Sequence, residues 1–355
     1  MGNRFFTIQQ ILDETDGRAG MTVRYTGTGA MLFSEFGARL LGLFPDKSGL
    51  NLLWLAHDLR EKIDNRSWLT GGERLWIAPQ RDYFFENPRD FEGFRVSPEI
   101  DPGVYKQNGD LHYENIFSLL DYMRNRIYAE SLASRRFQPI DDPYCSGLPY
   151  AGVKITDHLS ISSPGLDLCP WSVSMVNSCG PGNPGTALFP VRNNPSLLSY
   201  FDPVPPDRVS LGNGYARFLL DSRMHLKLAI NPENIVWENP AKILYVSPFP
   251  DRPEWFCVIK RSDDLPRNQD ECVDISMSNP TGPKGAIQVY NNLSEDHERL
   301  CYGEIELQLT KGRSVDGRTI STATHELLGY SGTRDEILDL AGKVLGIDCK
   351  PEIYC

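Results

Sequence analysis

The chain has 355 residues and a formal charge of -11, with 36 Lys and Arg against 47 Asp and Glu. This charge argues against a nucleic acid or a membrane surface as the main partner, because both attract basic surfaces. Hydrophobic residues make up 40% of the chain beside 30 Gly and 26 Pro, which favours a folded, turn-rich β protein over a disordered one. The length fits one large β domain or two smaller ones.

Targeting and cofactor motifs are scarce in this sequence. No apolar run reaches the roughly 18 residues that span a bilayer, and Met1-Gly2-Asn3-Arg4 does not lead into a signal-peptide segment. We expect a soluble protein, cytoplasmic if residue 1 is the native start and periplasmic or secreted if an export signal was removed. The eight cysteines form no C-x-x-C pair, and neither a Walker loop nor a dinucleotide fingerprint occurs. We therefore expect no metal site and no cofactor.

A short helix is predicted to open the chain, within residues 1–20. Thr7 and Gln10 have the spacing of a capping box, in which each side chain accepts a hydrogen bond from the other residue's backbone N–H. Short β-type runs follow at residues 21–25, 30–33, 37–43 and 51–54. The paired Gly71 and Gly72 stand before the next short strand and indicate positive φ or a close backbone approach.

A helical insertion is predicted between His112 and Ser134. Five apolar residues repeat there at helical spacing, and we expect this helix to pack against the outside of a sheet. They are Ile116, Leu119, Leu120, Met123 and Ile127. Residues 153–162 alternate instead, which predicts a strand with His158 on its polar side, while Asp157 interrupts its apolar side.

Further β-type runs lead to the end of the chain, which a helix closes. These runs lie at residues 224–230, 242–246, 255–260 and 286–290. Thr333 and Glu336 again have capping-box spacing, and Gly346 marks the end of the helix. We therefore expect one β domain over residues 21–332 with a helical insertion near 112–134. The C-terminal helix and tail, residues 333–355, should pack on the same domain.

The strand predicted around residues 300–310 is the leading candidate for a functional site. Its alternation places Tyr302, Glu304, Glu306 and Gln308 on one face, and Ile305, Leu307 and Leu309 on the other. Carboxylates and a carboxamide on one face suit hydrogen bonding to a polyhydroxylated ligand, and a carboxylate there can act as a general base. An ordinary half-buried strand with its polar face in water gives the same pattern.

Arg74 and Trp171 are the candidate binding residues outside this strand. The guanidinium of Arg74 offers several donors to ligand oxygens, and the alternative is pairing with an acid such as Glu73 or Asp82. Trp171 offers an apolar platform beneath a sugar ring. Trp76 offers a second platform or packs in the core.

Several motifs, taken in order, resemble those of the galactose mutarotase-like superfamily, and more closely those of its bacterial branch of aldose 1-epimerase-like proteins. They are Gly37-Ala38-Arg39-Leu40, Gly71-Gly72-Glu73-Arg74-Leu75-Trp76-Ile77-Ala78-Pro79, Pro170-Trp171-Ser172-Val173 and Tyr302-Gly303-Glu304-Ile305-Glu306. Together they extend over about residues 20–330. The resemblance implies a mainly β fold, a β-supersandwich with a few peripheral helices, whose large antiparallel sheets pack face to face and carry a sugar site.

The resemblance also implies a chemistry. In the family a carboxylate takes the proton of the anomeric hydroxyl and a histidine protonates the ring oxygen, so that the ring opens and recloses as the other anomer. Glu306, followed by Leu307 and Gln308, matches the catalytic Glu in its Glu-x-Gln setting. Its counterpart histidine is His158, within Asp157-His158-Leu159-Ser160, a stretch that lacks the Asn and the aromatic residue of the family motif.

We therefore predict a protein that binds a small-molecule or oligomeric carbohydrate and interconverts sugar anomers, with Glu306 and His158 as catalytic residues. Arg74, Trp171, Glu304 and Gln308 are the predicted substrate-binding residues. The alternative is a non-catalytic carbohydrate-binding module or an accessory protein of polysaccharide breakdown, which the incomplete histidine motif favours. The positions of Glu306 and His158 distinguish the catalytic protein from the binding module, because a proton-transfer pair requires both side chains to face one cavity.

Overall fold

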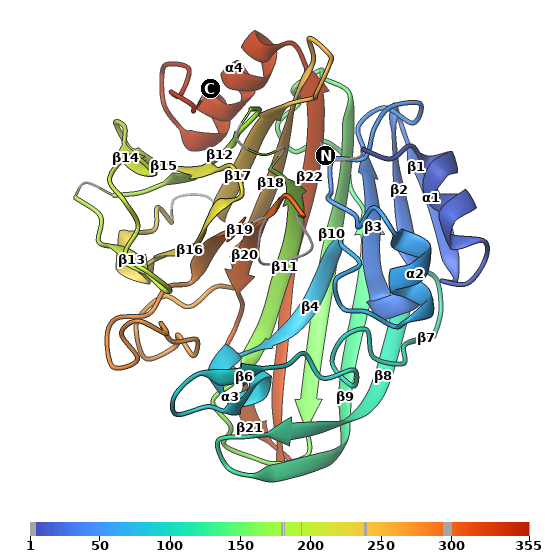
Figure 1. Ribbon diagram of the computed structural model, residues 1–355, viewed down its shortest axis with the longest axis vertical. Helices are drawn as coiled ribbons and strands as arrows, with labels where there is room; N and C mark the ends of the chain where they lie inside the picture. The colour runs from blue at the N-terminus through green and yellow to red at the C-terminus, as the bar shows by residue number, and fades with distance from the viewer. Residues whose placement is uncertain are drawn as a thin grey trace.

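The computed structural model describes residues 5–178, 180, 182–192, 194–237, 240–293 and 300–354. These residues form two large antiparallel sheets that pack face to face (Figure 1). In the described part of the chain, the first sheet has nine strands. Their spatial order is β1 (Met21–Thr26), β2 (Gly29–Ser34), β3 (Arg39–Phe44), β4 (Glu73–Ala78), β11 (Cys169–Asn177), β20 (Tyr302–Gln308), β19 (Ile287–Leu293), β16 (Arg223–Ile230) and β13 (Leu197–Ser199).

The second sheet has eleven strands among the described residues. Their order is β14 (Val209–Leu211), β15 (Tyr215–Leu220), β12 (Gly185–Pro190), β17 (Ala241–Pro248), β18 (Trp255–Ser262), β22 (Arg318–Gly332), β10 (Tyr150–Ile161), β9 (Arg126–Pro139), β8 (His112–Asp121) and β7 (Lys106–Gln107), with β21 (Arg313–Val315) paired to β22. A separate small hairpin joins β5 (Phe85–Asn87) and β6 (Glu92–Phe94). The expected mainly β sandwich is confirmed.

Helices in the described residues lie outside the two sheets (Figure 1). The α-helices are α1 (Ile8–Thr15), α2 (Leu59–Asp64), α3 (Gln80–Phe84) and α4 (Arg334–Leu345), and two short 3-10 helices are η1 (Phe36–Ala38) and η2 (Pro232–Asn234). Both predicted capping boxes are present, at Thr7 before α1 and at Thr333 before α4, and α4 ends at Gly346 in the left-handed conformation. None of these helices is long and apolar enough to cross a membrane.

The helical insertion predicted near residues 112–134 is wrong, because this segment forms the β8–β9 hairpin. Side chains on β8 alternate between buried and partly exposed, and Leu119 is buried while Ile116 is 75% exposed. Ile127, on β9, is 67% exposed. The apolar residues that fitted a helical period therefore lie on both faces of a hairpin, where cross-strand pairing outweighs the local pattern.

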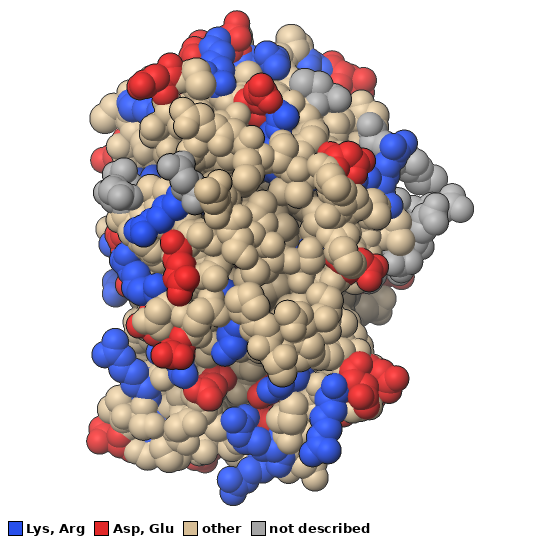
Figure 2. Space-filling view, turned by 90° about the vertical axis from the view of Figure 1, so that its left-hand side faces the viewer, with Lys and Arg blue, Asp and Glu red and all other residues tan. Residues whose placement is uncertain are grey.

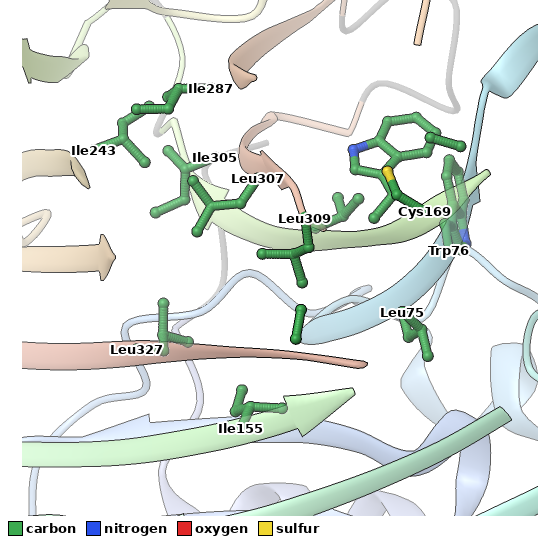
Figure 3. Close-up of a cluster of buried hydrophobic side chains, with 14 of the residues drawn as sticks. Leu75, Trp76, Ile155, Cys169, Ile243, Ile287, Ile305, Leu307, Leu309 and Leu327 are labelled. Atoms are coloured by element: carbon green, nitrogen blue, oxygen red, sulfur yellow. The ribbon is translucent and has the colours of Figure 1, made fainter. Parts of the chain in front are cut away.

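The hydrophobic core fills the space between the two sheets. Ile305 and Leu307 of β20 meet Leu327 of β22 and Ile155 of β10 there, and Figure 3 shows these side chains between the strands. All four are fully buried. The apolar face predicted for β20 is therefore the core-facing one.

A buried ion network also connects the sheets, and it explains why Asp157 stands among apolar residues. Arg135 on β9 donates to Asp157 Oδ1 at 2.8 Å and to Glu73 Oε2, across on β4, at 2.7 Å. His325 Nε2 lies 2.9 Å from Asp157 Oδ2. Burial raises the pKa of Asp157, but Arg135 and His325 outweigh burial and lower it to about 2. The carboxylate thus stays ionised in the interior, held by its partners.

Candidate functional site

The outer face of the nine-stranded sheet carries the polar side of β20. Register places Glu304 beside Met175 of β11 and Tyr290 of β19. Two residues further along the strand, Glu306 pairs with Val173 of β11 and Gln288 of β19. Because directly paired residues point to the same face, these side chains lie together on the face opposite the core.

A cavity of about 330 Å³ opens over this face. Aromatic side chains form most of its wall, namely Trp68, Trp76, Phe85, Phe91, Phe94, Trp171, Phe201, His225, Tyr290 and Tyr302. Arg74, Gln80, Lys227, Met277 and Glu304 complete the lining. This volume lies at the small end of ligand sites, which run to about 1,000 Å³, and it suits a ligand of roughly one ring.

Two ion pairs form the polar part of the cavity, one on each side of β20. Arg74 Nη2, from β4, lies 2.6 Å from Glu304 Oε1, and its guanidinium stands 4.0 Å over the Trp76 ring. Lys227 Nζ, from β16, lies 2.9 Å from Glu306 Oε2. Each cation is therefore paired with a carboxylate of β20, and of these two carboxylates only that of Glu304 lines the cavity.

Glu306 itself lies beneath the cavity wall and is fully buried. Its Oε2 accepts a second hydrogen bond, from Trp171 Nε1 at 2.8 Å, while Oε1 has no partner among the described residues. Burial raises the pKa of Glu306 to about 7, an effect that Lys227 opposes and Glu304 reinforces. Desolvation is thus the main cause of the raised pKa, and the like charge of Glu304 is a smaller one.

Comparison with known proteins finds distant structural likeness only. No family model and no curated protein matches the chain. Similar solved structures include a provisionally assigned aldose 1-epimerase from Escherichia coli K12, with 8% identity, coverage of 88% of this chain and 99% of that one, and a TM-score of 0.45. A galactose mutarotase-like protein from Clostridium acetobutylicum has 9% identity and a TM-score of 0.43, and the match covers 89% of this chain and 99% of that one. The Slr1438 protein from Synechocystis sp. PCC 6803 has 10% identity and a TM-score of 0.47, and the match covers 88% of this chain and 96% of that one.

The likeness is one of fold. A shared fold does not assign a reaction, because the same scaffold hosts unrelated sites, so any function has to be argued from this chain's own residues.

Three of the four predicted binding residues line the cavity, namely Arg74, Trp171 and Glu304. The fourth, Gln308, is fully buried and does not line it, and its Oε1 accepts a hydrogen bond from Cys169 Sγ at 3.4 Å. Arg74 pairs with Glu304, which is neither of the two acids considered from the sequence.

His158 is a correction to the predicted catalytic pair. It lies on β10 of the second sheet, where the buried side chains are those of Asp157 and Leu159, so that His158 points to the opposite, outer face. Its Nδ1 lies 2.7 Å from Thr322 Oγ1, and burial lowers its pKa. Glu306 and His158 therefore face away from each other across the sandwich and cannot exchange protons with one ligand.

Lys227 and His225 are two of the cavity residues that sequence reasoning missed. Their run, residues 224–230, was expected to be a strand, and β16 confirms it. Alternation with Leu226 and Leu228 would have put both on a polar face. No local sequence pattern shows that β19 lies between β16 and β20. The ion pair of Lys227 with Glu306 depends on this strand order and could not be predicted.

Proposed function

We propose that the cavity binds the ring of a saccharide and that the protein interconverts the anomers of a free sugar. The observation that carries this proposal is the combination of a ring-sized aromatic cavity with two carboxylate–cation pairs in its polar part. Aromatic faces suit the C–H faces of a sugar ring, and charged donors and acceptors suit its hydroxyl groups.

Proton transfer is the finer part of this proposal, with Glu304 as acceptor and Lys227 as donor. Both are register partners of Tyr290, so their backbones stand about two strand spacings, or roughly 10 Å, apart on either side of that residue. A ring over Tyr290 would contact both. Glu306 is a positioning residue, because it holds the Lys227 ammonium group without lining the cavity.

The reaction balances with these two groups alone. Glu304 takes the proton of the anomeric hydroxyl, the oxygen electrons form the carbonyl, and the bond from the anomeric carbon to the ring oxygen breaks. The ring oxygen keeps that electron pair and takes a proton from Lys227, which an ammonium group can give because an alkoxide is far more basic. Reversal of these steps after rotation of the aldehyde gives the other anomer.

Binding is tested by titrating the protein with free hexoses in a calorimeter. The Trp68→Ala variant removes one aromatic wall of the cavity and should weaken binding about tenfold. The matched control is Trp255→Ala, which removes a tryptophan that packs against the α4 side of the second sheet. A wild-type protein that binds no hexose, or equal losses in the two variants, would contradict the proposed site.

Catalysis is tested by polarimetry of a freshly dissolved anomer. The wild type should speed the change of rotation above the rate in buffer, and Lys227→Met should abolish the increase. Lys227→Arg, which keeps the charge but is a poorer acid, separates proton donation from binding. A protein that binds the sugar but leaves the rate at that of buffer would be the non-catalytic binding module.

A further inference from the structure

A second cavity lies behind one wall of the first. It has a volume of about 290 Å³. Pro79 and Arg81 line it, whereas Gln80, between them in the chain, lines the first cavity. The Gln80 backbone N–H donates to Asp274 Oδ1 at 2.9 Å, which fixes this part of the wall. Consecutive residues of the chain around Gln80 therefore line the two cavities in turn.

Positive charge distinguishes this second cavity, which we call the basic cleft. Its four cations are Arg81, Arg124, Lys284 and Lys311. They come from α3, the β8–β9 turn, the segment before β19 and the segment after β20. Only two carboxylates share the lining, those of Asp82 and Asp167, although the whole chain carries -11. A third carboxylate, that of Asp121, pairs with Arg124 from outside the lining, so that four cations face three acids and an excess of one positive charge remains.

The cations of the basic cleft keep unused hydrogen-bond donors. Arg81 Nε lies 2.7 Å from Asp82 Oδ1, and Arg124 Nη1 lies 2.9 Å from Asp121 Oδ2 and 3.4 Å from Asp82 Oδ2. Lys311 Nζ lies 2.6 Å from Asp167 Oδ1. Asp82 is 4% exposed, and this burial raises the pKa of its carboxyl group. Lys284 Nζ donates to the carbonyl oxygen of Cys272 at 2.9 Å and forms no ion pair that the described residues show. Since a guanidinium has five N–H groups and an ammonium three, several donors are left for a ligand.

α3 and β21 lie at the lower end of the molecule in Figure 1. Figure 2 shows Lys and Arg side chains at the lower end of the neighbouring face, with Asp and Glu side chains among them, below a middle region that is largely uncharged.

We propose that the basic cleft binds an oxyanion, namely a phosphate or carboxylate group. Resting on the proposed function, we further infer that this group belongs to the saccharide whose ring occupies the first cavity. Paired arginines suit either group, because the planar guanidinium matches two oxygens of a phosphate or a carboxylate at once. The protein would then select acidic sugars over their neutral counterparts.

The test uses inorganic phosphate, a hexose phosphate, a hexuronate and the neutral hexose, each titrated into the full-length protein in a calorimeter. The cleft variant is Arg81→Gln with Lys284→Gln. The control is Arg60→Gln with Lys350→Gln, an exposed pair on α2 and after α4 that changes the net charge equally. Circular dichroism checks that both variants are folded.

Phosphate should bind the wild type and the control, and the cleft variant should bind it at least roughly tenfold more weakly, since one charge-assisted hydrogen bond is worth about that factor. Absent phosphate binding, or equal weakening in the control, would overturn the basic cleft as an oxyanion site. If the hexose phosphate binds more tightly than the neutral hexose, the group is a phosphate, and if the hexuronate does, it is a carboxylate. If neither acidic sugar binds more tightly while inorganic phosphate still binds, the inference that one saccharide occupies both cavities is wrong. Failure of the neutral hexose alone would instead count against the proposed function.

Discussion

Replacing Glu306 by Gln is expected to change how stability depends on pH. Gln keeps the shape of a protonated carboxyl group but cannot ionise. In the folded protein burial raises the pKa of Glu306 from 4.5 to about 7, so between these values the folded state binds more protons than the unfolded state. The stability that this carboxyl contributes is therefore complete below pH 4.5 and is lost as the pH rises through 7.

The size of the effect follows from that interval. At about 1.4 kcal/mol for each pH unit, the loss in the wild type amounts to about 3 kcal/mol. Glu306→Gln lacks this loss, so its free energy of unfolding should gain about 3 kcal/mol relative to that of the wild type between about pH 5 and pH 8. Titrations shared by both proteins cancel in this difference.

Urea denaturation of both proteins at several pH values measures the difference. Met277→Leu is the control, because it alters the cavity lining without changing an ionisable group, and its difference from wild type should not vary with pH. If the wild type instead gained stability relative to Glu306→Gln as the pH rose, the attraction of Lys227 would outweigh burial and the reasoning would be refuted. A difference independent of pH would refute it equally.

Three further outcomes follow from the structure. Arg135→Gln should lower the free energy of unfolding by about 3–5 kcal/mol in urea, because it leaves the buried carboxylates of Glu73 and Asp157 without their main partner, and a loss no larger than that of Arg60→Gln would contradict this. Thr333→Ala should cost about 1 kcal/mol in thermal unfolding, since its hydroxyl accepts from the Glu336 N–H at the start of α4; an unchanged melting temperature would show that the cap contributes nothing. His158→Ala should leave saccharide binding and the polarimetric rate at wild-type values, whereas a large drop in rate would return the imidazole to the reaction.

Local patterns were sufficient for the features that depend on neighbouring residues. The capping boxes at Thr7 and Thr333 involve residues three apart, and both form as expected. Gly71, with φ of 102°, has its backbone so close to Trp54 that a Cβ would lie 2.2 Å from the Trp54 carbonyl oxygen. The alternation in β20 likewise predicted which side chains face the core, because the two faces of a strand differ at every second residue.

Features set by strand pairing could not be derived in this way. The β8–β9 hairpin has a sequence that also fits an amphipathic helix, and only its partner strands decide between the two. The polar side of His158 was predicted correctly, but not the sheet to which β10 belongs. Lys227 and Glu306 are 79 positions apart in the chain, and their contact exists only because β19 lies between their strands.

The position of β20 has a consequence for the growing polypeptide. This strand lies in the middle of the first sheet, between β11 and β19, although it is among the last to be synthesised. Until it emerges from the ribosome, β4 and β11 on one side have no continuous backbone pairing to β16 and β19 on the other. We expect a nascent chain that ends before β20 to expose unpaired strand edges and to depend on chaperones, so that ligand binding appears only when synthesis is nearly complete.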